Sequence, residues 1–256
     1  MALLFGSLVG LSLGLTGGGG SMLAVPLLLY GLGLSFRDAV MVSLAVVGLT
    51  AVYGSVVQRN KVDWMAGTVL GAGGIFGAPA GAWLGAGMPQ TVSLLLFAGL
   101  MFVIGLRMWR GKDDAFHPAI RCRRHPDGRL HSGWSCAGKM AVAGVLTGVL
   151  SGMFGVGGGF LVVPALLAVA ALPIERALAT SLVGISLVSA SAFFANFLMT
   201  PSLPVEPAAC FLGGAAIGMT AGVWIKDFLP ALALRRIFAA MIVFVAVWVV
   251  WKNTGM

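Results

Sequence analysis

Two glycine-rich stretches hold the residues of this chain that could do chemistry. Each reads G-x3-G-x2-G-x-G-G, followed by a proline and then by A-x3-S. A shift of 138 positions carries the first copy, Gly10 to Ser43, onto the second, Gly148 to Ser181, without a gap. A run of glycines can interrupt a helix and expose backbone N–H groups, which bind anions. The duplicated pattern therefore predicts two equivalent backbone sites for a negatively charged ligand.

Each break would end one half-helix and begin another, so that unpaired N–H groups meet at the positive end of a helix dipole. One serine beyond each break shares a helix face with the preceding alanine and is expected to face the break. The candidate binding residues are Gly17, Gly18, Gly19, Gly20, Ser21, Ser43, Gly155, Gly157, Gly158, Gly159 and Ser181. Further polar candidates are Thr16, Thr180, Asn196 and Gln58. Two alternatives stay open: the glycines could serve close helix packing, and each hydroxyl could bond back to its own helix.

The elements that must position these residues are membrane helices. Of 256 residues, 59% are hydrophobic and 9% are charged, against about 25% charged residues in an average soluble domain. Mean hydropathy is +1.01. Apolar stretches near the roughly 20 residues that cross a bilayer as a helix lie at 40–57, 65–86, 91–109, 139–153, 177–198, 207–225 and 232–251. Helices are expected because the alternating segments of a barrel are absent.

The two glycine-broken segments, 2–33 and 140–171, are too long for one ordinary span and too short for two. Each half of roughly 14 residues would reach about 20 Å at about 1.5 Å per residue, which favours a re-entrant hairpin of two half-helices. Basic residues favour the same arrangement. With two hairpins, all 16 Lys and Arg residues except Arg37 and Lys252 lie inside, whereas eight simple spans would place Lys226, Arg235 and Arg236 outside.

Three spans after each hairpin invert the second repeat relative to the first. The sequence thus predicts an all-α integral membrane protein with two inverted repeats, each a re-entrant hairpin plus three transmembrane helices. Repeat 1 is expected at 1–110, a basic cytoplasmic loop at 111–138 and repeat 2 at 139–256. Repeats of this kind place a binding site near the bilayer midplane, between the halves.

The motifs GLTGGGGSMLAVP at 14–26 and GMFGVGGGFLVVP at 152–164, each followed by A-x3-S, resemble the duplicated signature of the sulfite exporter TauE/SafE family. The resemblance covers both halves of the chain apart from the central loop. It implies a multi-pass protein of the cell (inner or plasma) membrane that transports a small sulfur-containing anion such as sulfite, a sulfonate or thiosulfate. The resemblance implies export, and the inverted repeat favours alternating access, with the anion held at half-helix N-termini.

Other classes of function are weighed by what the spans contain. All eight acidic residues are expected in loops or at helix ends, so no buried carboxylate is available for a proton relay. The glycine runs lack the strand-to-helix context of a dinucleotide fingerprint, and neither an enzyme activity nor a cofactor is expected. An anion channel on the same fold and a transporter of an unrelated small organic anion stay open as alternatives. The direction of flow, the coupling ion and the particular anion are also left open.

The central loop carries Cys122, His125, His131 and Cys136, a spacing that could enclose a zinc ion. It matches no established zinc module, so no metal site is predicted. In the cytoplasm Cys122 and Cys136 are expected to be reduced thiols. The net charge of +8 is assigned to inside retention and anionic lipid head groups, not to nucleic acid. The expected partners are the lipid bilayer and a small anion, and a homo-oligomer is compatible with the sequence.

Overall fold

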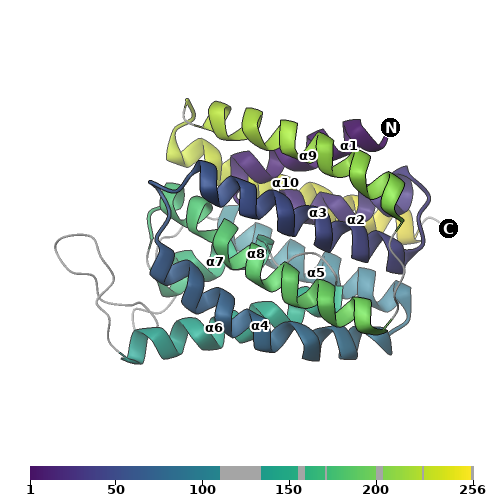
Figure 1. Ribbon diagram of the computed structural model, residues 1–256, viewed down its shortest axis with the longest axis horizontal. Coiled ribbons are helices and arrows are strands. Elements are labelled where there is room, and N and C mark those ends of the chain that lie inside the picture. Colours follow the sequence, from purple (N-terminus) through teal and green to yellow (C-terminus); the bar gives the residue numbers. More distant parts are fainter. Residues whose placement is uncertain (110–133, 155–158, 171, 200–203, 227, 255–256) are drawn as a thin grey trace.

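The computed structural model describes residues 1–109, 134–154, 159–170, 172–199, 204–226 and 228–254 (Figure 1). Within these ranges the chain forms helices and no strand, which confirms the all-helical class. The first half contains α1 (Ala2–Thr16), α2 (Gly20–Pro26), η1 (Leu27–Gly31), α3 (Phe36–Val57), α4 (Trp64–Ala86) and α5 (Gln90–Trp109). The second half contains α6 (Trp134–Phe154), α7 (Gly159–Val169), α8 (Ile174–Met199), α9 (Val205–Lys226) and α10 (Ala231–Thr254).

Six helical segments are long and apolar enough to cross a membrane: Phe36–Val57, Trp64–Ala86, Cys136–Phe154, Ile174–Met199, Val205–Lys226 and Leu232–Trp251. Shorter apolar helices cover Ala2–Thr16, Gly20–Gly31 and Thr91–Leu106. Large apolar side chains face outward, among them Phe76 at 80% and Leu198 at 84% exposure. Water does not tolerate an apolar surface of this extent, but lipid does. These features fit a multi-pass membrane protein.

Helix α6 corrects one predicted boundary. It begins at Trp134 and has 21 residues, so it starts inside the predicted loop 111–138 and before the predicted hairpin segment 140–171. The predicted boundary falls at Lys139, which the structure places within the helix. A lysine near a helix end can keep its stem along apolar surface while its ammonium reaches polar surroundings, so Lys139 does not end the helix.

The first glycine-broken segment folds back on itself. Gly20, at the start of α2, lies against the carbonyl oxygen of Val9 and the Cβ of Leu13, and Gly31, at the end of η1, lies against the ring of Phe5. The segment formed by α2 and η1 therefore runs antiparallel to α1. Pro26 ends α2 and the wider π-helical turn η1 follows it, as expected where proline removes a backbone donor.

Two glycine-lined seams join the halves of the chain. Helix α1 lies beside α9 at one edge of the bundle and α6 lies beside α4 at the opposite edge (Figure 1). In the first seam the close backbone approaches are Gly6–Phe211, Gly10–Ala215, Gly14–Met219, Gly214–Leu3, Gly218–Ser7 and Gly222–Leu11. In the second they are Gly144–Leu70, Gly148–Gly74, Gly152–Ala78, Gly73–Ala141, Gly77–Val145 and Gly81–Val149. Residue numbers rise together across each seam, so both helix pairs are parallel.

Each of these twelve approaches has a counterpart in the other seam, and one more, Gly85–Met153, extends the second seam at a position where the first has Lys226. A shift of 138 positions carries the α1 residues onto those of α6, and a shift of 141 positions carries the α4 residues onto those of α9. Each glycine in these pairs faces a backbone carbonyl, so a side chain there would separate the helices. This is how small residues associate helices in lipid, where no hydrophobic force drives them together.

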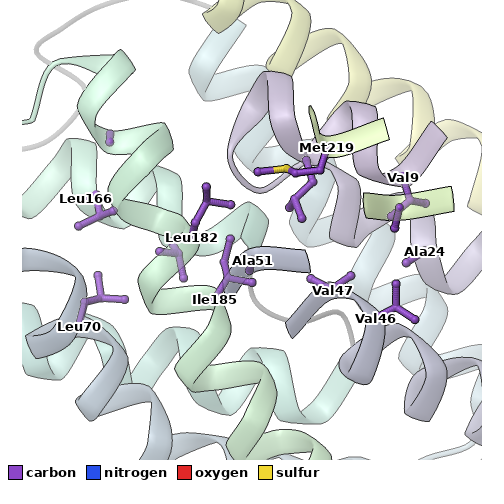
Figure 2. Packing of buried hydrophobic residues seen from close by; sticks show 14 of the residues in the cluster. Val9, Ala24, Val46, Val47, Ala51, Leu70, Leu166, Leu182, Ile185 and Met219 are labelled. Atoms are coloured by element: carbon purple, nitrogen blue, oxygen red, sulfur yellow. The ribbon is translucent and has the colours of Figure 1, made fainter. Parts of the chain in front are cut away.

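The centre of the bundle is formed by α3 and α8, which pack against each other in antiparallel directions: Gly48 lies against Ser189 and Gly54 against Leu182. Around them the main hydrophobic cluster draws side chains from both halves of the chain (Figure 2). Labelled members include Val9, Ala24, Val47, Leu166, Leu182 and Met219. Ala24 of α2 and Leu166 of α7 are therefore buried in a cluster that both halves form.

Candidate functional site

The first break begins at Gly17, where α1 ends. Gly17 has a φ of 66°, in the left-handed region, and its N–H donates to the carbonyl oxygen of Leu13. This is the usual glycine cap of a helix C-terminus. A Cβ on Gly17 would also overlap the carbonyl oxygen of Leu178 in α8. Only glycine satisfies both the backbone angle and the close approach.

Side chains next to the break hold its backbone in place. The Thr16 hydroxyl donates to the carbonyl of Ser12 at 2.6 Å and accepts the N–H of Gly19 at 2.8 Å. The Ser21 hydroxyl donates to the carbonyl of Gly18 at 2.7 Å. The N–H groups of Gly20 and Ser21 belong to the first turn of α2, whose donors have no acceptor within the helix. Both groups are thus backbone donors of the kind that an anion can contact.

The start of α7 contacts the first break. A Cβ on Gly18 would overlap the carbonyl oxygen of Gly159, the first residue of α7. A Cβ on Gly159 would lie 2.7 Å from the oxygen of Gly18 and 2.8 Å from the Ser21 hydroxyl. The first residue of α7 therefore contacts the first break directly. Gly155, Gly157 and Gly158 of the second break lie outside the described residues.

The two repeat-related serines are both fully buried but differ in their bonding. The Ser181 hydroxyl lies 2.7 Å from the carbonyl oxygen of Gly17 and 2.8 Å from that of Leu178, to which it can donate. It therefore faces the first break and not the second, which precedes it in the sequence, and its proton is engaged in holding the first break. The Ser43 hydroxyl has no hydrogen-bond partner within the described part of the chain. Of these two serines, Ser43 is therefore the one whose buried hydroxyl donor is not used within the described residues.

Ser151 is a second buried hydroxyl that lacks a partner among the described residues, and sequence reasoning missed it. The repeat places it at the position of Leu13, which packs against Gly20 of the first break. The sequence signal was weak because the serine has a leucine as its counterpart.

The further polar candidates divide into two groups. Thr180 accepts the N–H of Asp63 at 2.9 Å, and the Asn196 amide donates to the carbonyl of Ala192 in its own helix at 2.8 Å. Both are used in structural hydrogen bonds. Gln58 differs, because it is buried, its Nε2 has no partner among the described residues, and its Oε1 accepts a hydrogen bond from Lys226.

The burial of Lys226 differs most from what its sequence position predicts. This lysine was assigned to a basic turn after the span 207–225, yet it is the last residue of α9 and is only 3% exposed. A lysine next to a span normally extends to the membrane surface, so the neighbouring residues did not predict that Lys226 is buried. Its place between helix ends is set by the packing of α9 against α1 and α3.

The acidic residues of the described chain lie at helix starts. Asp38, Glu175 and Glu206 are in the first turns of α3, α8 and α9, and Asp63 caps α4 by accepting the N–H of Ala66. Acidic groups are favourable at these positions because of the helix dipole. Asp113, Asp114, Asp127 and Asp227 lie outside the described residues.

The metal alternative in the central loop gains no support. Within the described ranges no group of three His, Cys, Asp or Glu side chains could hold a metal ion. Cys122, His125 and His131 lie outside those ranges. Cys136 is disulfide-bonded, which corrects the expectation that it is a reduced thiol. A disulfide sulfur is not the thiolate that zinc requires.

Comparisons with known proteins identify the family of the chain. The family model of the sulfite exporter TauE/SafE family matches residues 2–249. Two relatives, each described as a probable membrane transporter protein, come from Xylella fastidiosa strains Temecula1 and 9a5c. Each is 32% identical over 256 residues, covering 97% of this chain and 93% of the relative. No solved structure matches the chain. Because the family match spans nearly its whole length, this chain belongs to the sulfite exporter TauE/SafE family and is a membrane transporter, not an enzyme.

Proposed function

We propose that this transporter exports a small sulfur-containing anion, of the sulfite, sulfonate or thiosulfate class, and binds it where the two glycine breaks meet. The observation that carries the proposal is the direct approach of Gly18 to Gly159 in a buried region between the halves. Backbone donors from the first turn of α2 reach this region from one repeat. The start of α7 reaches it from the other.

The polar groups at the breaks are suited to an oxyanion. The N–H groups of Gly20 and Ser21 are donors at the first break, where a helix N-terminus adds a positive dipole end. The buried, unpartnered hydroxyls of Ser43 and Ser151 are proposed as further donors, because their repeat counterparts Ser181 and Leu13 contact the first break. Gly17, Gly19 and Ser181 then shape the site, because their hydrogen bonds hold the backbone of the first break. Gly155, Gly157, Gly158 and Gly159 are proposed to provide the equivalent backbone from the second repeat.

We propose that the two repeats are inverted relative to each other and work by alternating access. Three features support this: six close approaches in each seam that the repeat relates to six in the other, the parallel direction within each seam, and the antiparallel crossing of α3 and α8. If each broken segment re-enters the membrane, the inverted arrangement requires these same directions. Rocking of one repeat against the other would expose the breaks to each side in turn.

Uptake of radiolabelled sulfite into liposomes that contain the purified protein tests this function. We expect saturable uptake that thiosulfate and an alkyl sulfonate inhibit and that Ser43→Ala reduces. Ser55→Ala is the matched control, because Ser55 lies on the same helix and its hydroxyl bonds to the carbonyl of Val52 in that helix. Absence of saturable flux for all three anions would remove the substrate class from the proposal.

Counterflow separates a transporter from the alternative of an anion channel. In alternating access, sulfite loaded inside the liposomes accelerates entry of labelled sulfite, because each loaded return resets the site. In a channel, flux follows the electrochemical gradient and shows no such acceleration. Ohmic flux without counterflow would favour the channel.

A further inference from the structure

A buried lysine and a buried glutamine join the ends of two helices at the first break. Lys226 is 3% exposed and Gln58 is 5% exposed. The Lys226 Nζ donates to Oε1 of Gln58, which caps the C-terminus of α3. A cation removed from water is costly, so an ionisable residue inside a membrane protein is a functional candidate by default. The binding site described above does not use this pair.

Helix registers place the pair level with the first break. Gly14 lies against Gly222 across the parallel seam of α1 and α9, so Lys226, one turn beyond Gly222, lies level with the C-terminal end of α1, where the first break begins. Gly54 lies against Leu182 across the antiparallel crossing of α3 and α8, so Gln58, one turn beyond Gly54, lies level with Leu178. The Leu178 carbonyl is the group that contacts Gly17. The packing of α9 on α1 and of α3 on α8 therefore places Lys226 and Gln58 at the level of the same break.

The orientation of the Gln58 amide follows from its partner. An ammonium group is a donor only, so the amide oxygen must face Lys226 and the amide nitrogen keeps its two N–H donors. Nε2 is buried and has no hydrogen-bond partner among the described residues. An unsatisfied buried donor costs free energy, and an anion at the break would remove that cost.

The pair has no charged equivalent at the second break. The repeat relates Gln58 to Asn196 and Lys226 to Gly85. Asn196 uses its amide nitrogen to donate to its own helix, and glycine has no side chain. The charge therefore belongs to one end of the bundle, the end that also carries Arg59 and Lys61 between α3 and α4. By the distribution of basic residues this end is expected to face the cytoplasm.

We propose that Lys226 and Gln58 are ligands of the transported anion at the first break. The ammonium provides the fixed positive charge, and Gln58 Nε2 donates a hydrogen bond to one oxygen of the anion. The inference rests on the proposed function and adds to it a substrate preference: the site accepts a fully charged oxyanion such as sulfite and rejects neutral sulfur compounds. It also places the charged half of the site where an exported anion enters.

The decisive variant is Gln58→Glu, assayed by sulfite uptake into liposomes across a range of sulfite concentrations. A glutamate keeps the size of the side chain and pairs with Lys226, so a purely structural role would be preserved. Its negative charge would instead cancel the lysine and repel the anion. We expect KM for sulfite to rise about tenfold or more, the scale expected when a buried site loses a charge-assisted hydrogen bond.

Two further variants complete the test. Lys226→Met removes the charge and is expected to raise KM similarly. Arg59→Gln removes an exposed charge from the same end of the bundle and is expected to change KM by less than about twofold, since exposed charges are screened. A thermal unfolding midpoint in Gln58→Glu that equals or exceeds that of the wild type shows that the fold is intact.

The outcomes separate the two proposals. Saturable wild-type flux with an unchanged KM in Gln58→Glu overturns this inference and leaves the proposed function in place. A similar loss in Arg59→Gln also overturns it, because general surface charge would then explain the effect. Wild-type protein without saturable sulfite flux overturns the proposed function, and this inference with it.

Discussion

At the scale of single residues, the end of helix α1 depends on one glycine for two separate reasons. Gly17 combines a left-handed backbone with a close approach to the Leu178 carbonyl. Gly33 has nearly the same φ, 67°, but nothing lies within 4 Å of the position its Cβ would take. The second glycine is therefore a natural control for the first.

We predict that Gly17→Ala destabilises the protein more than Gly33→Ala. The left-handed conformation costs a residue with a Cβ about 1–2 kcal/mol, and both variants bear this cost. Only Gly17→Ala also places a methyl group against the Leu178 carbonyl and pushes α1 away from α8. This overpacking adds about 1–3 kcal/mol of destabilisation. Thermal unfolding of the purified variants measures the difference, and equal midpoints would show that the contact with Leu178 is unimportant.

The two related serines should separate stability from binding. Ser181→Ala removes the hydroxyl bonded to the buried carbonyls of Gly17 and Leu178, so we expect a loss of about 1–2 kcal/mol in stability. Ser43→Ala removes a hydroxyl with no partner in the described chain, so its stability should hardly change while sulfite flux falls. Unfolding midpoints and flux, measured on the same preparations, test both parts. A flux loss confined to Ser181→Ala would contradict the proposed role of Ser43.

At the scale of elements, the parallel seams explain why glycine recurs along α1, α4, α6 and α9. Each seam glycine faces a backbone carbonyl of the neighbouring helix. The packing alternative that the sequence left open therefore holds for Gly10, Gly14, Gly148 and Gly152 of the repeated motif. The residues at the break itself, Gly17, Gly18 and Gly20, also meet neighbouring backbone, so close packing and site formation are achieved by the same glycines.

Adjacent glycines of α9 offer a test of the seam. Gly214 lies against the carbonyl of Leu3, whereas nothing lies within 4 Å of a Cβ on Gly213. We expect Gly214→Ala to cost about 1–3 kcal/mol through overpacking. Gly213→Ala should be neutral or stabilising by up to about 1 kcal/mol, because alanine favours a helix interior over glycine. Comparable unfolding midpoints for the two variants would argue against close contact between α1 and α9.

At the scale of the whole molecule, the first broken segment governs the topology. The approach of Gly31 to Phe5 brings the end of this segment back beside its start. If the segment re-enters the membrane, positions 2 and 35 lie on the same side, and position 59, after the first full span, lies on the other. A simple span would separate positions 2 and 35 instead.

Single cysteines at these positions distinguish the two topologies. In a chain whose native cysteines are replaced by serine, we expect Ala2→Cys and Ser35→Cys to react with a membrane-impermeant maleimide from the same side of intact cells. Arg59→Cys should show the opposite accessibility. Labelling of Ala2→Cys and Ser35→Cys from opposite sides would rule out the hairpin and the inversion that depends on it.

The sequence by itself determined the properties that belong to local composition and to the repeat. Hydropathy indicated membrane helices, the doubled glycine motif located both breaks, and the same motif identified the family. Acidic residues were expected at helix ends, and those described lie there. These features depend on residues close together in the chain, so a pattern is sufficient to detect them.

Only the tertiary structure decided which distant groups meet. Ser181 bonds to a carbonyl 164 positions away while its counterpart Ser43 has no partner in the described chain. Lys226 is buried against Gln58, 168 positions away. Both depend on how helix ends from opposite halves are brought to one level. A repeat predicts equivalent places, but the packing of unlike neighbours determines what chemistry each place can do.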